Sequence, residues 1–105
     1  MINTKEMTHI GSFMVDSGQA IVGDPCYLDE WKSQYDNFDE YKNSEGEYGY
    51  LGSCHATITN GYGELGNGKA VAFTTGWGDG YYSVYSILDD QGRIGQIVID
   101  FVGAE

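Results

Sequence analysis

A period of two in the hydrophobic positions dominates the second half of the chain and predicts short strands. Residues 69–75, 81–88 and 94–102 are rich in β-branched and aromatic side chains, and in residues 53–59 Cys, Ala and Ile alternate with His and Thr. Between the last two segments, Asp-Asp-Gln-Gly-Arg at 89–93 is typical of a type I turn with glycine in the left-handed bulge position. The sequence therefore predicts four strands here, with the last two joined as a hairpin.

The N-terminal part of the chain shows a second pair of strand patterns. Residues 10–15 and 19–22 are mostly apolar, and the Asp16-Ser17-Gly18 segment between them has the residues that favour a tight turn. We therefore expect 10–15 and 19–22 to pair as a hairpin.

One helix is predicted directly after this hairpin. Asp24 is a favoured helix N-cap, and Pro25 is favoured at the first helical position. Several poor helix formers follow, so the helix is expected to be short or broken. Apolar side chains recur every three or four residues, as on one face of an α-helix, at Leu28, Trp31, Tyr35 and Phe38.

Together these segments predict a mostly β, α+β protein with about six strands and one short helix. The expected arrangement is a small antiparallel β-sandwich or half-barrel with the helix on one face. A chain of 105 residues suits a single domain, here 1–105. Its 16 glycines against one proline support many tight turns and oppose a helical bundle.

The chain is strongly acidic, which excludes one class of partner. Five Lys and Arg face 16 Asp and Glu, for a net charge of −11, whereas nucleic-acid binding depends on basic side chains that displace counterions. No direct nucleic-acid contact is therefore expected. Eight of the acids lie between Asp24 and Glu47 with only two lysines, so this segment could cover a basic surface of another protein.

The N-terminus and the cysteines favour the cytoplasm. The first residues, MINTKEMTHIG, lack the apolar run of a signal peptide, and no segment approaches the roughly 18 apolar residues of a membrane span. Cys26 and Cys54 form no C-x-x-C pair and suit a reducing compartment. We expect a cytoplasmic protein without membrane contact.

Enzymatic and metal motifs are weak in this sequence. Residues 61–66 match G-x-G-x-x-G, but a further strand follows instead of the helix that a dinucleotide site requires, so a glycine-rich hairpin loop is predicted. Cys54 and His55 are neighbours in a predicted strand and leave opposite faces, so they cannot form a nucleophile–base pair. No catalytic residue, cofactor or zinc site is predicted. The open alternative is a metal-assisted hydrolase that uses Asp16, Asp24 and Asp79.

Residues 74–82, TTGWGDGYY, hold the strongest candidate for a binding site. Three glycines in five residues free backbone N–H groups to converge on an anion, and Trp77 and two tyrosines could stack on a planar ring. The alternative is a wide hairpin loop in which Trp77 caps the core. The cation would be Lys69 or Arg93. The full set of predicted ligand-binding residues is Ser17, Gln19, Lys69, Thr74, Thr75, Gly76, Trp77, Gly78, Asp79, Gly80, Tyr81, Tyr82 and Arg93.

Several blocks of the sequence, taken in combination, resemble a family of small phage and bacterial proteins of unassigned function. The resemblance covers most of the chain except residues 32–49. It implies a phage-borne accessory protein in the host cell cytoplasm, and it carries over no catalytic residue. The blocks are VDSGQ (15–19), GDPCY (23–27) with Trp31, GNG (66–68), TTGWGDGYYSVY (74–85) and GRIGQIVIDF (92–101).

The sequence thus favours a non-enzymatic binding protein. The leading hypothesis is that it sequesters a small molecule, a nucleotide-type host defence signal, as a homo-oligomer. The alternative is an acidic inhibitor that mimics nucleic acid and covers a basic surface of a host protein with residues 29–47.

Overall fold

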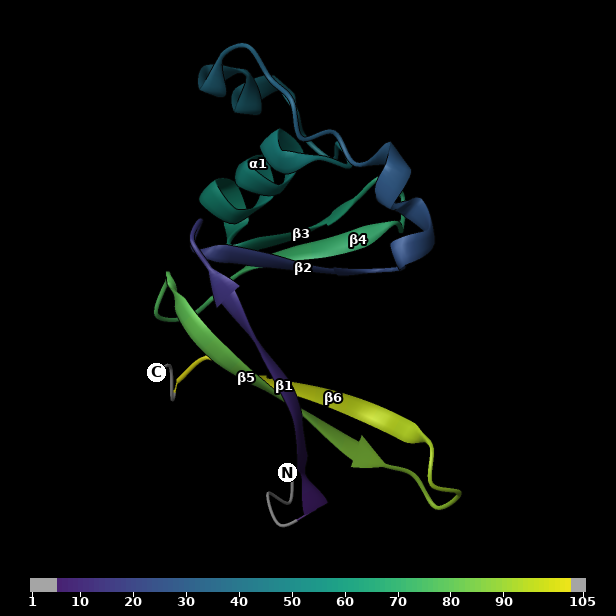
Figure 1. The fold of residues 1–105 in the computed structure, drawn as a ribbon. Coiled ribbons are helices and arrows are strands. Elements are labelled where there is room, and N and C mark those ends of the chain that lie inside the picture. The colour runs from purple at the N-terminus through teal and green to yellow at the C-terminus, as the bar shows by residue number, and fades with distance from the viewer. Residues whose placement is uncertain (1–5, 103–105) are drawn as a thin grey trace. The chain divides into compact units, whose positions relative to one another are not determined.

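The structure is a computed structural model of the 105-residue chain, and it describes residues 6–102. Within these residues six strands form two three-stranded antiparallel sheets (Figure 1). Short helices lie between the second and the third strand in the chain. This confirms the predicted mostly β, α+β class. No helix of residues 6–102 is long and apolar enough to cross a membrane. In chain order the elements are β1 (Thr8–Val15), β2 (Gln19–Gly23), η2 (Pro25–Glu30), η3 (Phe38–Asn43), α1 (Tyr50–Asn60), β3 (Tyr62–Leu65), β4 (Ala70–Thr74), β5 (Gly80–Leu88) and β6 (Ile94–Asp100), where η marks a 3₁₀ helix.

Contacts between residues divide the chain into two compact units, which are described separately. The terminal unit comprises residues 1–18 and 76–105, and the central unit comprises residues 19–75. The terminal unit holds the sheet β1–β5–β6, and the central unit holds the sheet β2–β4–β3 together with η2, η3 and α1. The single domain expected for 1–105 stays a prediction.

The core of the terminal unit is built around one tyrosine of β5. Tyr82 has 0% of its surface exposed and lies opposite Phe13 of β1 in the strand register. Its ring packs edge-on against Phe101, with 5.1 Å between the ring centroids, and its hydroxyl donates to the Gly78 carbonyl at 2.6 Å. Because side chains alternate along a strand, Tyr81 lies on the opposite face of the sheet.

The predicted hairpin between the last two strands is confirmed. β5 and β6 pair antiparallel, and Gly92 between them has a positive φ of 78°. The Asp89 carboxylate accepts hydrogen bonds from the backbone N–H groups of Arg93 and Gln91, both at 2.9 Å, and from the Arg93 guanidinium. These bonds favour the charged carboxylate and lower the pKa of Asp89 below its ordinary value.

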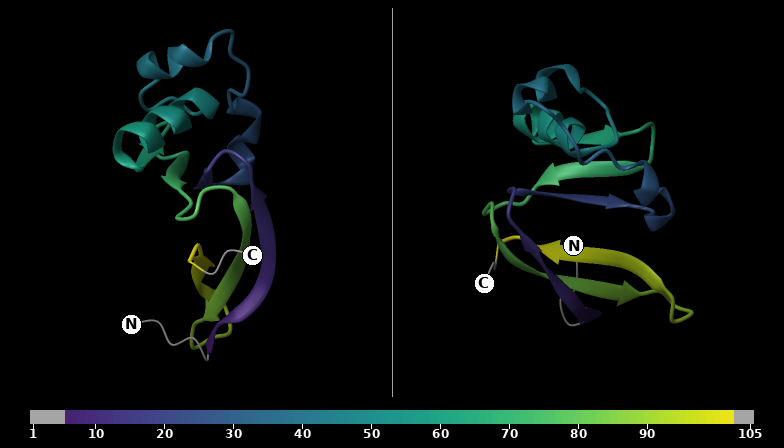
Figure 2. Two further views of the ribbon diagram at one scale, coloured as in Figure 1. Left: turned by 90° about the vertical axis from the view of Figure 1, so that its left-hand side faces the viewer. Right: turned by 45° about the horizontal axis from the view of Figure 1, so that its top comes forward.

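In the central unit, α1 lies against one face of the sheet (Figures 1 and 2), and small residues form the contact. Ala56 of α1 faces Gly63 of β3 so closely that a Cβ on Gly63 would lie 2.8 Å from the Ala56 Cβ. The core around this contact includes Leu65 and Ala72, each with 0% exposure. Small residues therefore set the distance between the helix and the sheet.

The strand predicted for residues 53–59 is wrong, because this segment is part of α1. β-branched residues near its end favoured a strand, but the helix accommodates them in its last turns, where the Thr57 hydroxyl donates to the Ser53 carbonyl at 3.0 Å. Gly61, with a φ of 85°, ends the helix in the left-handed conformation. Gly61 is thus a helix C-cap, and the neighbours Cys54 and His55 lie on a helix instead of on opposite faces of a strand.

The sixth strand lies where a loop was expected. Residues 61–66 were predicted to form a glycine-rich hairpin loop, but Tyr62–Leu65 form β3. The chain reverses only afterwards, at residues 66–69, where Asn67 has a φ of 56°. The G-x-G-x-x-G motif thus lies on a strand that leads into another strand, β4, and no helix follows it.

The hairpin predicted for residues 10–15 and 19–22 is wrong, although both segments lie in strands. β1 pairs with β5, and β2 pairs with β4. The Asp16-Ser17-Gly18 segment does bend, with Gly18 at a φ of 68°, but it connects strands of two different sheets. Turn residues specify a local change of direction, whereas strand pairing here depends on partners far along the chain.

The helix expected after Asp24 is present only as its first turns. The Asp24 carboxylate accepts from the Cys26 N–H at 2.8 Å, and Pro25 is the first helical residue, so the predicted start is confirmed. The helix is η2, and it ends before Trp31, which is extended at φ −68° and ψ 122°. The apolar face expected to continue to Phe38 is wrong, because that residue begins the separate helix η3.

Candidate functional site

The residues predicted to bind a ligand are divided between the two units. Those of the terminal unit lie in the loops before β5 and in the β5–β6 hairpin, and those of the central unit lie at the start of β2 and at both ends of β4. The terminal unit holds Ser17, Gly76, Trp77, Gly78, Asp79, Gly80, Tyr81, Tyr82 and Arg93, and the central unit holds Gln19, Lys69, Thr74 and Thr75.

The loops around Ser17 and Trp77 meet at one end of the terminal sheet. A Cβ on Gly18 would lie 3.8 Å from the Gly78 Cα, so the two loops are in contact. Trp77 is 70% exposed, and its indole N–H donates to the Val102 carbonyl at 2.9 Å. Trp77 therefore does not cap a core: one edge of its ring is fixed, and most of the ring is accessible.

Two of the predicted roles at this loop do not fit the structure. Tyr82 is fully buried, so it supports the Gly78 carbonyl and cannot stack on a ligand. Arg93 pairs with Asp89 at 2.9 Å beyond the far end of β5, about 30 Å of strand from Gly80. It is the only Lys or Arg in the described part of the terminal unit. The Trp77 loop thus receives no cation from the part of its own unit that the structure describes.

In the central unit the side chain of Gln19 serves the fold. Its amide oxygen accepts from the Ser53 hydroxyl at 2.6 Å and from the Thr57 hydroxyl at 3.1 Å, and its amide nitrogen lies 3.4 Å from the Cys54 sulfur. These contacts fasten β2 to α1. The hydrogen-bonding capacity expected to serve a ligand is therefore used between two elements of the same unit.

The other predicted residues of the central unit do not form one group. Thr75 is 1% exposed. Thr74 and Lys69 lie at opposite ends of β4. The Lys69 ammonium is 3.6 Å from the Glu30 carboxylate and 5.7 Å from the centre of the Tyr27 ring. Lys69 is thus engaged with η2, away from Thr74.

The aspartates proposed as metal ligands are not brought together. Asp24 lies in the central unit, whereas Asp16 and Asp79 lie in the terminal unit. Across residues 6–102, no group of three or more His, Cys, Asp or Glu side chains is placed to hold a metal ion.

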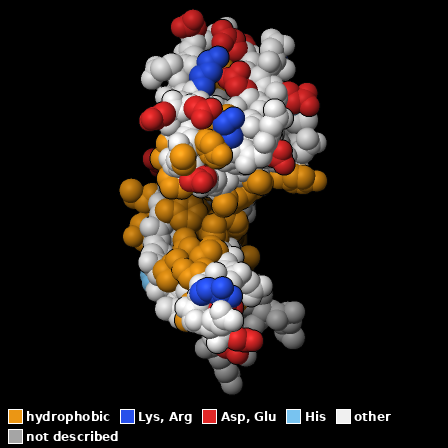
Figure 3. Space-filling view, turned by 90° about the vertical axis from the view of Figure 1, so that its right-hand side faces the viewer, with side chains coloured by type: hydrophobic (Ala, Val, Ile, Leu, Met, Phe, Trp, Pro, Cys, Tyr) orange, Lys and Arg blue, Asp and Glu red, His pale blue; other side chains and the backbone are white. Residues whose placement is uncertain are grey.

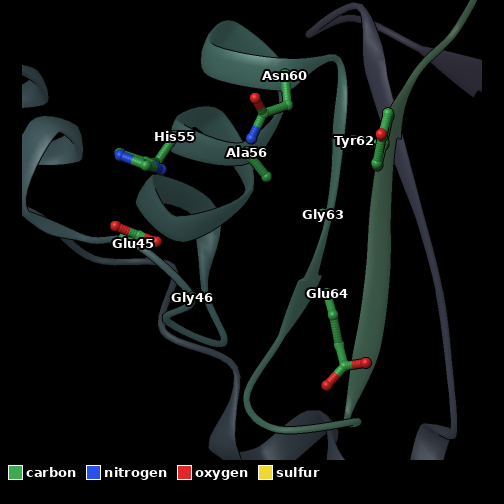
Figure 4. A pocket seen from close by; sticks show the side chains of 8 residues that line it. All are labelled: Glu45, Gly46, His55, Ala56, Asn60, Tyr62, Gly63 and Glu64. Atoms are coloured by element: carbon green, nitrogen blue, oxygen red, sulfur yellow. The ribbon is translucent and has the colours of Figure 1, made fainter.

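A separate pocket of about 210 Å³ lies in the central unit (Figure 4). It is bounded by α1, by β3 and by the turn at residues 45–46. β3 is an edge strand of its sheet, so its free side is available to form a wall. The lining residues are Glu45, Gly46, His55, Ala56, Asn60, Tyr62, Gly63 and Glu64.

Small residues create this hollow. Ala56 and Gly63 bring the helix close to the strand, and Gly46 leaves the third side without a side chain. A Cβ on Gly46 would meet no atom within 4 Å. The turn is nevertheless fixed to the end of β3, because the Gly66 N–H donates to the Gly46 carbonyl at 2.8 Å. The pocket is therefore a consequence of close backbone packing.

The lining of the pocket on the α1 side combines one carboxylate with neutral polar groups. Glu45 belongs to the turn, and its side chain lies on the same side of β3 as those of His55 and Asn60 (Figure 4). Tyr62 and Glu64 alternate with Gly63, which faces Ala56, so their side chains leave β3 on the face away from α1. His55 is the only basic side chain among the lining residues. Such a lining favours a cationic group and opposes a phosphate, because no Lys or Arg lines the pocket.

Sequence reasoning missed this pocket because it placed five of the eight lining residues in the wrong elements. His55 was assigned to a strand, and Tyr62 and Glu64 were assigned to a loop. No spacing in the sequence links Glu45 to residues 10 to 19 positions further on. The available signal was the pair of small residues, Ala56 and Gly63, which allow a helix to lie close to a strand.

The fold and the pocket define a small α+β protein with an acceptor-lined cavity in its central unit. A family model described as protein of unknown function (DUF4241) matches residues 3–99. The chain therefore belongs to the DUF4241 family, whose function is unassigned. No curated protein and no solved structure matches the chain.

Proposed function

We propose that this protein is a non-enzymatic binding protein whose central-unit pocket takes a cationic group, an ammonium or a guanidinium. The observation that carries the proposal is the lining, in which the Glu45 carboxylate lies on the α1 side of β3 and no Lys or Arg is present. N–H donors with a positive charge form their strongest hydrogen bonds with carboxylates. The volume of about 210 Å³ suits a group of side-chain size, since pockets for larger ligands measure about 300–1,000 Å³.

The charge of the central unit supports a basic protein as the source of this group. Residues 19–75 hold nine Asp and Glu and three Lys, for a net charge of −6. Acidic side chains are spread over the surface of this unit in Figure 3. Two of the lysines already lie 3.6 Å from a carboxylate, Lys32 from Glu47 and Lys69 from Glu30. A basic partner would be attracted by this field and would place one Arg or Lys side chain in the pocket.

Binding of small cations tests the pocket directly. Ethylguanidinium and butylammonium, titrated at millimolar concentration, are expected to shift the NMR resonances of His55 and Asn60, whereas the neutral butyramide is not. The combined substitution Glu45→Gln and Glu64→Gln should weaken binding at least tenfold, since it removes the Glu45 acceptor and the second negative charge among the lining residues. The matched control, Glu6→Gln with Asp90→Asn, removes the same charge from the terminal unit and should leave binding unchanged.

A lysine-rich peptide distinguishes the two sources of the cation. If the partner is a basic protein, the peptide should bind at least tenfold more tightly than butylammonium, and added salt should weaken it more steeply. Equal affinity would mean that the pocket serves a free amine. Absence of any shift with both small cations, or equal losses in the two double variants, would overturn the proposal.

A nucleotide-type ligand at the Trp77 loop is the second candidate function. The 70% exposure of Trp77 favours it, because an anchored and accessible indole can stack on a base. Here the chain would be a phage-borne accessory protein that sequesters a host defence signal in the host cytoplasm. Backbone N–H groups of this loop, such as that of Gly76 with its positive φ, would bind the phosphate in place of a cation.

Thermal-shift screening of cyclic and linear nucleotides tests this second candidate. A ligand at this loop should raise the melting temperature, and Trp77→Ala should remove the rise. Tyr62→Ala is the matched control, because Tyr62 is a similarly exposed aromatic residue (67%) in the central unit. Recovery of the nucleotide intact after denaturation would distinguish binding from catalysis. No stabilisation by any nucleotide at millimolar concentration would reject the candidate.

A further inference from the structure

Aromatic side chains of the central unit gather where η3 approaches the start of α1. The Tyr35 ring stacks on that of Tyr50, with 5.7 Å between the centroids, and meets the ring of Phe38 at 6.4 Å. Phe38 in turn lies 5.1 Å from Tyr41, because residues three apart in a 3₁₀ helix lie one above the other. We call these four side chains the aromatic cluster.

The aromatic cluster lies outside the buried core of its unit. η3 contains no buried residue, and the core of the unit includes Leu65 and Ala72 instead. Tyr35 and Phe38 keep 44% and 42% of their surface accessible. Apolar surface that is gathered in one place and left in water is typical of an interaction site, and aromatic side chains are enriched in such sites.

Carboxylates accompany the exposed rings. Asp36 precedes η3, and Asp39 and Glu40 follow Phe38 within it, so that with three residues per turn they lie on the two sides of its aromatic ridge. All three carboxylates are exposed. The ion pairs found in the described part of the chain use other carboxylates, and Lys42, the one cation of η3, takes part in none of them. The charge of these three acids is therefore available to a partner.

We infer that the aromatic cluster binds an arginine-rich segment of a basic partner protein. The choice of a basic partner rests on the proposed function, but this surface is separate from the pocket. A guanidinium is planar, stacks on aromatic rings and donates to carboxylates in pairs, whereas the ammonium of lysine is a strongly hydrated point charge. Exposed rings with unpaired carboxylates beside them therefore select arginine over lysine.

Peptides of equal charge test this selection. Two peptides alternate glycine with arginine in one case and with lysine in the other. The arginine peptide is expected to bind about fivefold more tightly and to shift the ring resonances of Tyr35 and Phe38 in NMR spectra of the unmodified protein. Equal affinities, or binding without shifts at these rings, would overturn the inference. Tighter binding of a trimethyllysine peptide would also overturn it, because the cluster would then select a quaternary ammonium.

Substitution by leucine separates the ring face from its apolar bulk. Tyr35→Leu and Phe38→Leu, singly and together, should remove the preference for arginine and change the affinity for the lysine peptide little. Tyr27→Leu is the matched control and should keep the preference: this tyrosine of the same unit is 38% exposed, and the Lys69 ammonium already lies 5.7 Å from its ring centre. A preference that persists in the folded leucine variants, or that is lost in the control, would contradict the inference.

The carboxylates are tested by Asp39→Asn with Glu40→Gln. This pair should weaken both peptides and make their binding less sensitive to salt, whereas Glu6→Gln with Asp90→Asn should do neither. Failure here is distinguishable from failure of the pocket, because Glu45→Gln with Glu64→Gln should leave the preference for arginine unchanged. A free chain of twice 11.5 kDa that the leucine substitutions make monomeric would show that a second copy covers the cluster, and would overturn the inference.

Discussion

Each unit buries one face of a three-stranded antiparallel sheet. The side chains that do so are small in the central unit and large in the terminal unit. In the central unit α1 covers the sheet, and the contact is made by Ala56 and Gly63, whose small size lets the backbones approach. The described part of the terminal unit has no helix over its sheet β1–β5–β6. There the large ring of Tyr82, in contact with Phe101, fills the core.

This difference has a consequence for where each unit can bind. A helix on a sheet produces hollows wherever a side chain is missing, and the pocket beside Gly63 is one of them. A sheet without a helix leaves its outer strand accessible, and β6 is the example. We therefore expect the central unit to recognise a group in its cavity, whereas the described part of the terminal unit offers its loops and strand edges.

The largest effect is expected from Leu65→Ala in the core of the central unit. Leu65 is 0% exposed, and truncation of a buried leucine costs about 2–5 kcal/mol, because it removes apolar contacts and leaves a cavity. Chemical denaturation should show this loss in the free energy of unfolding. Leu88→Ala in the terminal unit, at a leucine 54% exposed, should cost under about 1 kcal/mol.

Amide hydrogen exchange tests whether the two units unfold independently. If they are, Leu65→Ala should speed amide exchange in α1, β3 and β4 while β1, β5 and β6 keep their protection. Equal acceleration in both sheets would instead show that the chain unfolds as the single domain predicted from its length.

The next effect is expected from Gln19→Ala, which removes the polar link between β2 and α1. The Ser53 hydroxyl would lose its acceptor, whereas the Thr57 hydroxyl can still donate to the Ser53 carbonyl, and a partly buried polar group without a partner costs about 1–3 kcal/mol. Gln96→Ala, at an exposed glutamine of β6, is the control and should change the free energy of unfolding little. If Gln19 instead serves a ligand, its substitution would weaken binding and leave thermal stability unchanged.

Much of the fold could be predicted because local signals and tertiary contacts agree. The β5–β6 hairpin is an example, since the Asp89 and Gly92 turn and the flanking alternation specify the same pairing. Residues 53–59 failed because small and β-branched residues fit both a helix and a strand, and only the contact of Ala56 with Gly63 decides between them.

The candidate site could be predicted far less well than the fold. Gln19 has the chemistry of a ligand-binding residue, but it lies opposite Ser53 and Thr57 once α1 packs on the sheet. The pocket depends on the same packing, so no local pattern in the sequence predicts it. A turn or a cap can be recognised from neighbours in sequence, whereas a cavity requires the positions of three separate elements.

A smaller effect is expected from Tyr82→Phe in the core of the terminal unit. The change keeps the buried ring and removes only the hydroxyl that donates to the Gly78 carbonyl at 2.6 Å, a loss of about 1 kcal/mol. Since Gly78 is next to Trp77, the fluorescence of that exposed indole should also change. Tyr81→Phe, at a tyrosine 46% exposed, should alter neither quantity. An unchanged stability would mean that the 2.6 Å bond contributes nothing beyond the packing of the ring.

The smallest effect is expected from acid, acting on the β5–β6 hairpin through Asp89. Its folded pKa is lowered by the backbone N–H groups of Arg93 and Gln91, so it lies below the value of about 3.9 of an unfolded chain. The resulting stabilisation is fully present above about pH 4. It is lost as the pH falls through the folded pKa, because below that pH Asp89 is protonated in both the folded and the unfolded state. The protection of the Gln91 and Arg93 amides against hydrogen exchange, relative to the exchange rate of an unfolded chain at the same pH, should fall over that range. Asp89→Asn should remove this pH dependence and Asp90→Asn should not. An Asp89 carboxyl that titrates at or above its ordinary value in NMR would show that the hairpin does not depend on this charge.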